Sequence, residues 1–180
     1  MQLRRAPILL TLLVGCARPA PPTASPTSAP VATDRWAHAP DAWPRFRDAL
    51  AGAWHGTTAD GAAVDVVFRP IAGASALAET FGRPERATMT LYHPDHAGLV
   101  ATHYCAQGNQ PRLRATAIAP DQLRFAEDAT TDLDPDEARL VELTFTLGAD
   151  RFERVEDYLA PDGTHERTTW RFVRAAAAAE

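Results

Sequence analysis

The side chains best suited to chemistry lie in one stretch in the middle of the chain. His103 and Cys105 are separated by one residue, and in a β-strand this spacing places both side chains on the same face. A neighbouring histidine favours the thiolate form of a cysteine, and a thiolate is a nucleophile. However, no third group is placed to orient the histidine, and a lone cysteine in a strand is most often a small buried hydrophobe. We therefore rank nucleophilic catalysis below ligand binding.

A block of polar residues around this pair is suited to holding the head group of a ligand. It includes the amide-rich connection Gln107-Gly108-Asn109-Gln110. Ligand sites combine apolar walls with a few polar groups that fix orientation. The alternative is that His103 and Asn109 satisfy backbone groups at a tight corner, and the sequence leaves both interpretations open. The candidate ligand-binding residues are Glu79, His93, His103, Tyr104, Cys105, Asn109, Gln110 and Arg112.

Glu79 is the candidate that lies farthest from this block in the sequence. It shares a strand face with Leu77 and Phe81, so either the carboxylate points into an apolar interior or the two apolar side chains point outward. A buried carboxylate requires a cationic partner. The candidate partners are Arg112, Arg114 and Arg154.

The sequence contains no other catalytic or cofactor-binding motif. A Gly-rich phosphate loop, the His-Glu-x-x-His and Cys-x-x-Cys patterns and the Gly-x-Ser-x-Gly elbow are all absent. The acidic segment 131–138 is similar in spacing to a calcium loop, but it lacks the required glycine and the distal glutamate. We therefore expect no metal and no cofactor, and whether the protein is an enzyme stays open.

Short strands are needed to position these residues. After Gly52 the chain alternates apolar and polar residues in short segments, with turn signals about every ten residues. One helix is predicted before them, over residues 41–50, because Trp43, Phe46 and Leu50 recur at helical spacing. The predicted strands cover residues 53–58, 63–69, 75–81, 87–92, 99–105, 112–118, 122–126, 138–147, 151–159 and 164–174.

An up-and-down antiparallel barrel is the simplest fold for this pattern. The tight turns favour antiparallel connections, and no segment between the strands is long enough for a crossover helix. Closing a twisted sheet of about ten strands removes both edges and leaves a lumen wide enough for a small ligand. We predict an all-β barrel of about ten strands with one short N-terminal helix. Its apolar lining is predicted to comprise Leu77, Leu91, Leu99, Leu113, Leu143, Phe145 and Leu147.

The N-terminal residues have the features of an export signal. Arg4 and Arg5 precede an apolar segment, 6–14, which is too short to span a bilayer. Leu13-Val14-Gly15-Cys16 resembles the lipobox of bacterial lipoproteins, which implies cleavage after residue 15 and acylation of Cys16. Residue 17 is alanine rather than the aspartate that retains some lipoproteins in the inner membrane. The resemblance therefore implies a cell-envelope protein, anchored by lipid in the outer membrane and facing the periplasm.

The rest of the chain divides by composition. Residues 16–33 are rich in Pro, Ala, Ser and Thr and cannot bury enough surface to fold, so we expect an extended tether. Residues 34–174 form the predicted barrel domain, and 175–180 a disordered tail. The formal net charge of −5 disfavours nucleic acid as a partner. With Cys16 acylated, Cys105 has no partner, so the fold must hold without a disulfide.

Two resemblances to known barrels are carried by these residues. Gly52-Ala53-Trp54 resembles the Gly-x-Trp start of lipocalins and other calycin barrels, in which an arginine of the last strand packs against the tryptophan. Arg171 or Arg174 would take that role here. The segments Ser75–Thr80, Met89–His93 and Thr102–Leu113 are similar to an uncharacterised family of lipocalin-like bacterial proteins, which implies the barrel but no reaction. In calycin barrels a buried pair such as Glu79 with an arginine implies a site for a ligand carboxylate, unless the pair is structural.

His165 invites comparison with nitrobindin, a haem-binding calycin relative that uses a histidine near its carboxyl terminus. The surrounding Thr164-His165-Glu166-Arg167 does not match closely, so haem stays a minor alternative. We therefore rank three functions. The first is a membrane-anchored binder of a small apolar or amphipathic ligand. The second is a structural or interaction lipoprotein with a filled barrel, and the third is a haem-binding or enzymatic calycin.

Overall fold

A computed structural model describes residues 41–95, 98–119 and 121–176 of the chain. The predicted signal peptide at 1–15, the acylation site Cys16 and the tether at 16–33 lie outside the described residues, as do residues 177–180 of the predicted tail. Among the described residues, no helix is both long enough and apolar enough to cross a bilayer. The described residues cover most of the predicted barrel domain.

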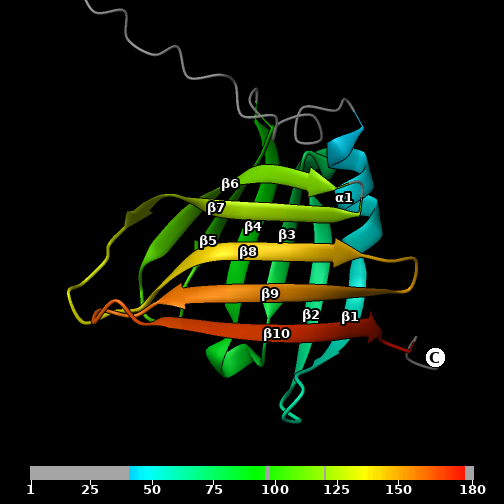
Figure 1. The fold of residues 1–180 in the computed structure, drawn as a ribbon. Helices are drawn as coiled ribbons and strands as arrows, with labels where there is room; N and C mark the ends of the chain where they lie inside the picture. Colours follow the sequence, from blue (N-terminus) through cyan, green and yellow to red (C-terminus); the bar gives the residue numbers. More distant parts are fainter. Residues whose placement is uncertain (1–40, 96–97, 120, 177–180) are drawn as a thin grey trace, which may run out of the picture. The chain divides into compact units, whose positions relative to one another are not determined.

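The described residues form a closed barrel of ten antiparallel strands, preceded in the sequence by one short α-helix (Figure 1). Consecutive strands pair with one another, and β1 closes the ring against β10. The predicted all-β, up-and-down barrel is therefore confirmed. The elements are α1 (Ala42–Leu50), β1 (Gly52–Thr57), β2 (Ala63–Ile71), β3 (Ala76–Phe81), β4 (Thr88–Asp95), β5 (Gly98–Tyr104), β6 (Gln110–Ala119), β7 (Gln122–Thr131), β8 (Arg139–Leu147), β9 (Arg151–Leu159) and β10 (His165–Arg174), with single 3-10 turns at Ala72–Ala74 and Pro84–Arg86.

The β6–β7 hairpin is longer than the sequence predicts. Predicted at 112–118 and 122–126, its strands extend over 110–119 and 122–131. The two strands stay paired because a register shift between Arg112 and Leu113 accommodates one extra residue on β7. Such a bulge bends the hairpin without ending it, and the alternation pattern of the sequence breaks at that point.

Helix α1 closes one end of the barrel by burying one of its faces. Ala42, Phe46 and Leu50 are spaced four residues apart, so they form a single stripe, and all three are buried. Burying a phenylalanine side chain contributes about 1.5–3 kcal/mol. The ring of Phe46 has three aromatic neighbours at centroid distances of 5.3 to 5.7 Å, namely Tyr92, Phe125 and Phe145.

The expected tryptophan–arginine contact forms beside the end of α1. Trp54 is buried, its indole N–H donates to the carbonyl of Leu50 at 2.6 Å, and the guanidinium carbon of Arg174 lies 4.3 Å from a ring centroid. Arg174 also donates to the carbonyl of Ala51 at 2.9 Å. The last carbonyls of a helix lack intrahelical donors, so these bonds satisfy groups that the helix leaves open. The start of β1 is thereby joined to both α1 and β10.

Arg171, which the sequence offers as the other partner for Trp54, does not take that role. It lies on the outer face of β10 and pairs with Glu153 at 3.3 Å, because alternate residues of a strand face opposite sides. Gly52 is needed where β1 starts, since its φ of +123° is unfavourable for residues with a side chain. A Cβ atom there would also lie 3.0 Å from Nη1 of Arg174.

The apolar lining of the lumen agrees with the prediction except at one position. Leu91 lies on the outer face of β4, because its neighbours Thr90 and Tyr92 both point inward. Leu147 is partly buried against the core. The other predicted lining residues are buried, namely Leu77, Leu99, Leu113, Leu143 and Phe145.

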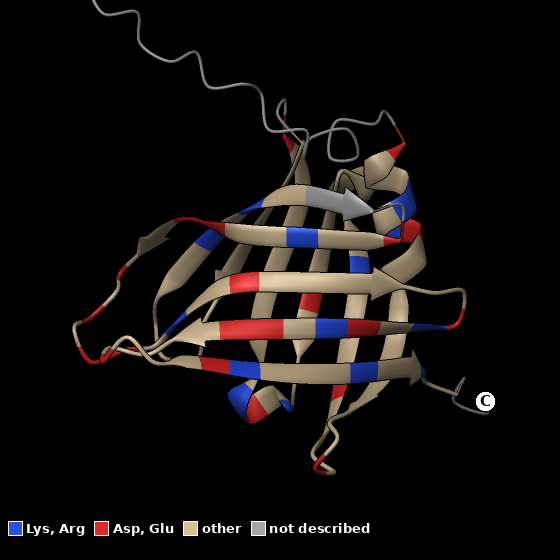
Figure 2. Cartoon of the chain, viewed as in Figure 1, with Lys and Arg blue, Asp and Glu red and all other residues tan. Residues whose placement is uncertain are grey.

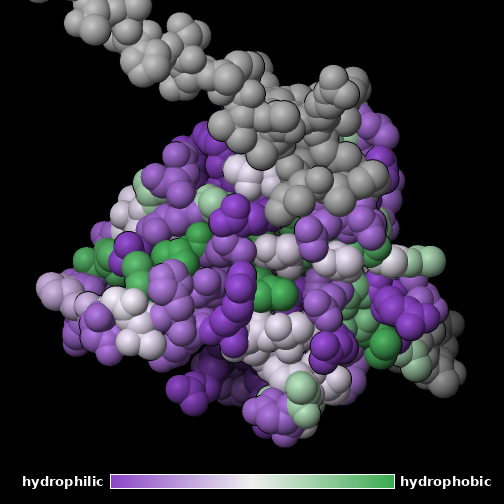
Figure 3. Space-filling view, in the orientation of Figure 1, coloured by the Kyte–Doolittle hydropathy of each residue, from purple (hydrophilic) through white to green (hydrophobic). Residues whose placement is uncertain are grey.

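Strands β6–β10 carry acidic and basic residues together (Figure 2). Some of them pair across neighbouring strands on the outer face, as Arg171 does with Glu153 at 3.3 Å. Exposed pairs of this kind contribute about 0.2–1 kcal/mol each. On the face of the described residues seen in Figure 3, hydrophilic residues predominate and apolar residues form small groups.

Candidate functional site

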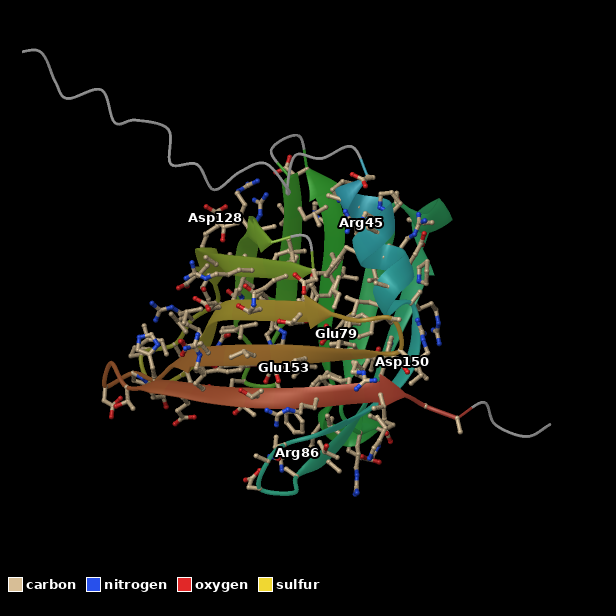
Figure 4. All side chains as sticks on the ribbon, turned by 45° about the vertical axis from the view of Figure 1, so that its right-hand side comes forward. Arg45, Glu79, Arg86, Asp128, Asp150 and Glu153 are labelled. Atoms are coloured by element: carbon tan, nitrogen blue, oxygen red, sulfur yellow. The ribbon has the colours of Figure 1, made fainter. Side chains whose placement is uncertain are left out.

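Ionisable side chains lie in the lumen between helix α1 and the opposite end of the barrel. We call this opposite end the distal end; it is formed by the turns 58–62, 82–87, 105–109, 132–138 and 160–164. Arg154 of β9 is 1% exposed and contacts two carboxylates, Glu79 of β3 at 2.5 Å and Glu156 at 2.6 Å. The hydroxyl of Tyr92 donates to the second oxygen of Glu79 at 2.6 Å. Figure 4 shows Glu79 within the ring of strands.

These three ionisable residues, Glu79, Arg154 and Glu156, are called the ion cluster. Burial opposes the charge of Arg154, but the carboxylates of Glu156 and Glu79 outweigh it and raise the pKa of the guanidinium above its ordinary value. Burial raises the pKa of Glu156, and Arg154 partly opposes this rise. Nε of Arg154 is buried without a hydrogen-bond partner among the described residues. The cluster therefore holds one permanent cation and a carboxyl group with increased affinity for a proton.

Two aromatic rings, Phe81 and Trp170, lie against the ion cluster, and we call them the aromatic pair. The ring of Phe81 is centred 4.7 Å from the guanidinium carbon of Arg154, which is a cation–π contact. The ring of Trp170 meets Phe81 edge-on at 5.5 Å, and its N–H donates to Glu156 at 3.4 Å. Both rings are only partly buried. They therefore lie between the ion cluster and space that solvent reaches.

Each ring of the aromatic pair lines a surface pocket, one on either side of the β1–β2 hairpin. β10 pairs with β9 over residues 165–173 but with β1 only over 171–174, so the tip of the hairpin stands apart from β10. The pocket beside Trp170, of about 500 Å³, lies in this gap. The other, which we call the Phe81 pocket, has a volume of about 660 Å³ and lies between the hairpin and the β3–β4 turn. Its lining includes the apolar residues Ala63, Val64 and Phe81 and the charged residues Arg83, Glu85 and Arg86.

His103 is buried in the lumen and neutral at physiological pH. Burial and the nearby charge of Arg154 lower its pKa to about 3. Its Nδ1 shares a hydrogen bond with the hydroxyl of Thr90 at 3.0 Å, and its Nε2 shares one with the hydroxyl of Tyr158 at 3.3 Å. Cys105 is a half-buried free cysteine that lies just past the end of β5, in the β5–β6 turn, and not in the strand where the sequence predicts it. Because hydroxyl groups engage both ring nitrogens, the imidazole is not placed to act as a base for the thiol.

Asn109 joins two turns of the distal end. It is fully buried, and its amide nitrogen donates to Glu137 at 2.9 Å and to the carbonyl of Ala138 at 3.1 Å. Its Oδ1 is buried without a partner among the described residues. Gln110 lies on the outer face and accepts a hydrogen bond from the hydroxyl of Thr131 at 2.8 Å. These contacts agree with the interpretation in which the amides satisfy polar groups at a corner.

The predicted ligand-binding residues do not converge at one mouth of the barrel. Tyr104 is 45% exposed on the outer face of β5, and Arg112 is half exposed on the outer face of β6. The β4–β5 register places His93 and His103 toward opposite ends of the ladder. Glu79 and His103 face the lumen, Cys105 and Asn109 lie in the β5–β6 turn, and the other four candidates lie on the outer face, namely His93, Tyr104, Gln110 and Arg112.

His165, the residue behind the haem alternative, points away from the lumen. Its side chain is 58% exposed and pairs with Asp157 at 2.9 Å on the outer face. It is therefore not placed to ligate a group held inside the barrel. Among the described residues, no group of three or more His, Cys, Asp or Glu side chains is arranged to hold a metal ion.

Sequence reasoning finds only part of the ion cluster and the aromatic pair. It names Arg154 as one of several candidate partners for Glu79, and it misses Glu156 and Trp170. A signal was present in β9, where Arg154 and Glu156 share the inner face with Phe152 and Tyr158. Charged residues that alternate in phase with aromatic ones indicate a polar group inside a barrel.

Comparisons with known proteins support the fold. No protein-family model matches the chain, and no curated protein matches it significantly. Among solved structures the chain is similar to the crystal structure of Rv2717c from M. tuberculosis, with a TM-score of 0.53 and 16% sequence identity. The match covers 77% of this chain and 99% of that chain. At this identity the likeness shows the antiparallel barrel alone, and the predicted lipocalin-like family and lipobox stay predictions.

Proposed function

We propose that this protein is a lipid-anchored protein of the cell envelope whose barrel binds a small amphipathic ligand in the Phe81 pocket. The observation that carries the proposal is the meeting of an apolar wall and a charged rim in that pocket. Ala63, Val64 and Phe81 offer apolar contact, and the β3–β4 turn offers charged groups. The volume of about 660 Å³ falls within the range of small-molecule sites, about 300–1,000 Å³.

The half of the lumen next to α1 is filled by side chains, so we assign the ligand to the distal end. The rings of Phe46, Tyr92, Phe125 and Phe145 all contact one another. That half of the barrel agrees with the filled-barrel alternative. The ligand in our proposal instead lies outside the aromatic pair, whose ring of Phe81 packs against Arg154 of the ion cluster at 4.7 Å.

The lipid anchor in this proposal rests on the lipobox-like segment Leu13-Val14-Gly15-Cys16. One acyl chain alone gives marginal membrane binding, so stable anchoring requires more than one chain at Cys16. An extended tether at 16–33 would hold the barrel away from the bilayer. The Phe81 pocket would then be reached by solutes of the periplasm.

Filling the pocket tests the binding proposal. Thr88 lines the Phe81 pocket, so Thr88→Trp places an indole in the space that the ligand needs. We expect the affinity for a dansyl-labelled undecyl amphiphile, measured by fluorescence titration, to fall about tenfold or more, which corresponds to about 1.4 kcal/mol. The matched control is Thr146→Trp, which lines a different pocket of about 460 Å³ at the β8–β9 turn and should leave binding unchanged.

The outcome of this titration separates the first two functions. Equal affinity of the wild type and Thr88→Trp would contradict a ligand in the Phe81 pocket. Absence of binding by the wild type, together with native mass spectra free of carried-over small molecules, would favour the structural or interaction lipoprotein.

A further inference from the structure

We propose that the Phe81 pocket selects amphiphiles with an anionic head group, a carboxylate or a phosphate, which Arg83 and Arg86 bind. This inference rests on the proposed function and adds the chemical class of the ligand. Both arginines line the pocket. Residues Pro84–Arg86 form a 3-10 turn, and Arg83 is the extended residue that directly precedes it, so the two arginines flank Pro84 and Glu85. The β3–β4 turn thus presents two guanidinium groups to one pocket.

Neither guanidinium is engaged within the described part of the chain. Most other arginines of the described residues contact an acidic group, as Arg139 does with Glu127 at 2.9 Å, and Arg69 is an exception that lies outside the pocket. For Arg83 and Arg86 the described residues provide no ion pair and no side-chain hydrogen bond. Their N–H donors are therefore directed to solvent or to a ligand.

The acidic residues of the pocket leave the two arginines free. Asp65 contacts the ring of His55 at 2.9 Å. Glu85 lies between the arginines in sequence, and the described residues contain no ion pair that involves it. Each guanidinium offers five N–H donors in a planar fork, which matches the paired oxygens of a carboxylate or phosphate.

The position of the apolar wall sets the orientation of the ligand. Phe81 and Val64 line the inner part of the pocket, and the ring of Phe81 is backed by Arg154 at 4.7 Å. Figure 4 shows Arg86 on a turn outside the ring of strands that encloses Glu79. An apolar chain against Phe81 therefore brings its head group to the rim, where both guanidinium groups lie.

Fluorescence titration of the full-length chain carrying Cys16→Ser, which removes the acylation site, tests this inference. Three probes share one dansyl-labelled undecyl chain and differ only in the head group: a carboxylate, a phosphate monoester and an uncharged alcohol. We expect at least one anion to bind about tenfold or more tightly than the alcohol, because charge-assisted hydrogen bonds are stronger than neutral ones. The anionic probe with the higher affinity relative to the alcohol identifies the preferred head group. Higher salt concentration should reduce the difference in affinity between the anions and the alcohol.

A double variant assigns the effect to the two arginines. Arg83→Ala with Arg86→Ala should lower the affinity for the anions to that for the alcohol, with the alcohol's affinity and the Tm unchanged. The control, Arg69→Ala with Arg151→Ala, removes the same charge from other surface positions and should change none of the three affinities. If the anions bind no better than the alcohol, or if the double variant keeps their advantage, the head-group inference is wrong while the proposed function stands. If no probe binds, both are wrong.

Discussion

Arg154 of β9 and Glu79 of β3 form an ion pair across the lumen, with 2.5 Å between Nη1 and Oε1. The two residues are 75 positions apart in the sequence, and their strands are not neighbours in the barrel. Both side chains are almost completely buried, so water cannot replace either partner. The pair links two walls of the barrel, and removing either partner alone would leave an uncompensated buried charge.

Removing the cation should therefore be costly. Arg154→Met keeps a long side chain but leaves Glu79 and Glu156 buried without a cation, and we expect a loss of about 3–5 kcal/mol in the free energy of unfolding. Urea denaturation at neutral pH measures the change. A triple variant that adds Glu79→Gln and Glu156→Gln should recover much of the loss, because no uncompensated charge remains. Arg167→Met, whose pair with Glu142 is on the surface, is the control. A loss below about 1 kcal/mol for Arg154→Met would contradict the interpretation that Arg154 compensates two buried carboxylates.

The two arginines of β10 should differ in their effect on stability. Arg174→Ala removes the contact with Trp54 and the hydrogen bond to Ala51, which we expect to cost about 1–2 kcal/mol. Arg171→Ala removes only an exposed pair with Glu153 and should change stability by less than about 0.5 kcal/mol. Thermal unfolding of the two variants compares them directly. Equal losses would show that the Trp54 contact has no special role.

Folding stability should decrease as the pH is lowered below about 6.5. The unfolded chain protonates His103 near its ordinary pKa of 6.5, whereas in the folded barrel its pKa is about 3. Between these values the unfolded state binds more protons, so acid favours unfolding by up to about 1.4 kcal/mol per pH unit from this residue. Urea denaturation at pH 7 and pH 5 measures the slope. His103→Gln retains hydrogen-bonding groups for Thr90 and Tyr158 but cannot titrate, so it should reduce the slope. An unchanged slope in His103→Gln would show that His103 does not cause the decrease in stability at low pH.

Asn109 should matter for stability more than for binding. Asn109→Ala leaves Glu137 and the carbonyl of Ala138 without their donor, at about 1–3 kcal/mol. Gln110→Ala, on the outer face, should stay within about 0.5 kcal/mol of the wild type. The Tm from thermal unfolding and the affinity from fluorescence titration with the dansyl-labelled amphiphile are compared between the two variants. Weaker binding by Asn109→Ala at unchanged Tm would restore the interpretation of Asn109 as a ligand-binding residue.

The lipid anchor can be tested with the two cysteines of the chain. Cys16→Ser should abolish incorporation of radiolabelled palmitate and release the protein from the membrane fraction, because the acylated thiol is lost. Cys105→Ser should leave labelling and fractionation as in the wild type. Acylation that persists in Cys16→Ser would show that the lipobox interpretation is wrong.

Local patterns in the sequence were sufficient to predict the fold. Alternation of polar and apolar residues depends only on neighbours along the chain, so the strands were predicted to within a few residues at most of their ends. The spacing of Trp43, Phe46 and Leu50 likewise predicted α1. The β6–β7 hairpin was predicted too short because its bulge interrupts the alternation without interrupting the pairing.

The sequence by itself determined the strands, the helix and the need of Glu79 for a cation, and the tertiary structure decided which residues meet. Arg112 and Arg114 face outward while Arg154 faces Glu79, and this depends on the register of strands far apart in the chain. The Phe81 pocket lies where β2 extends beyond its last pair with β3, Val66 with Phe81, so that the β1–β2 hairpin and the β3–β4 turn flank it. Alternation is a local property that a sequence displays directly. Register and closure are set by contacts between distant strands. Only the tertiary structure therefore shows which side chains form the ion cluster and line the Phe81 pocket.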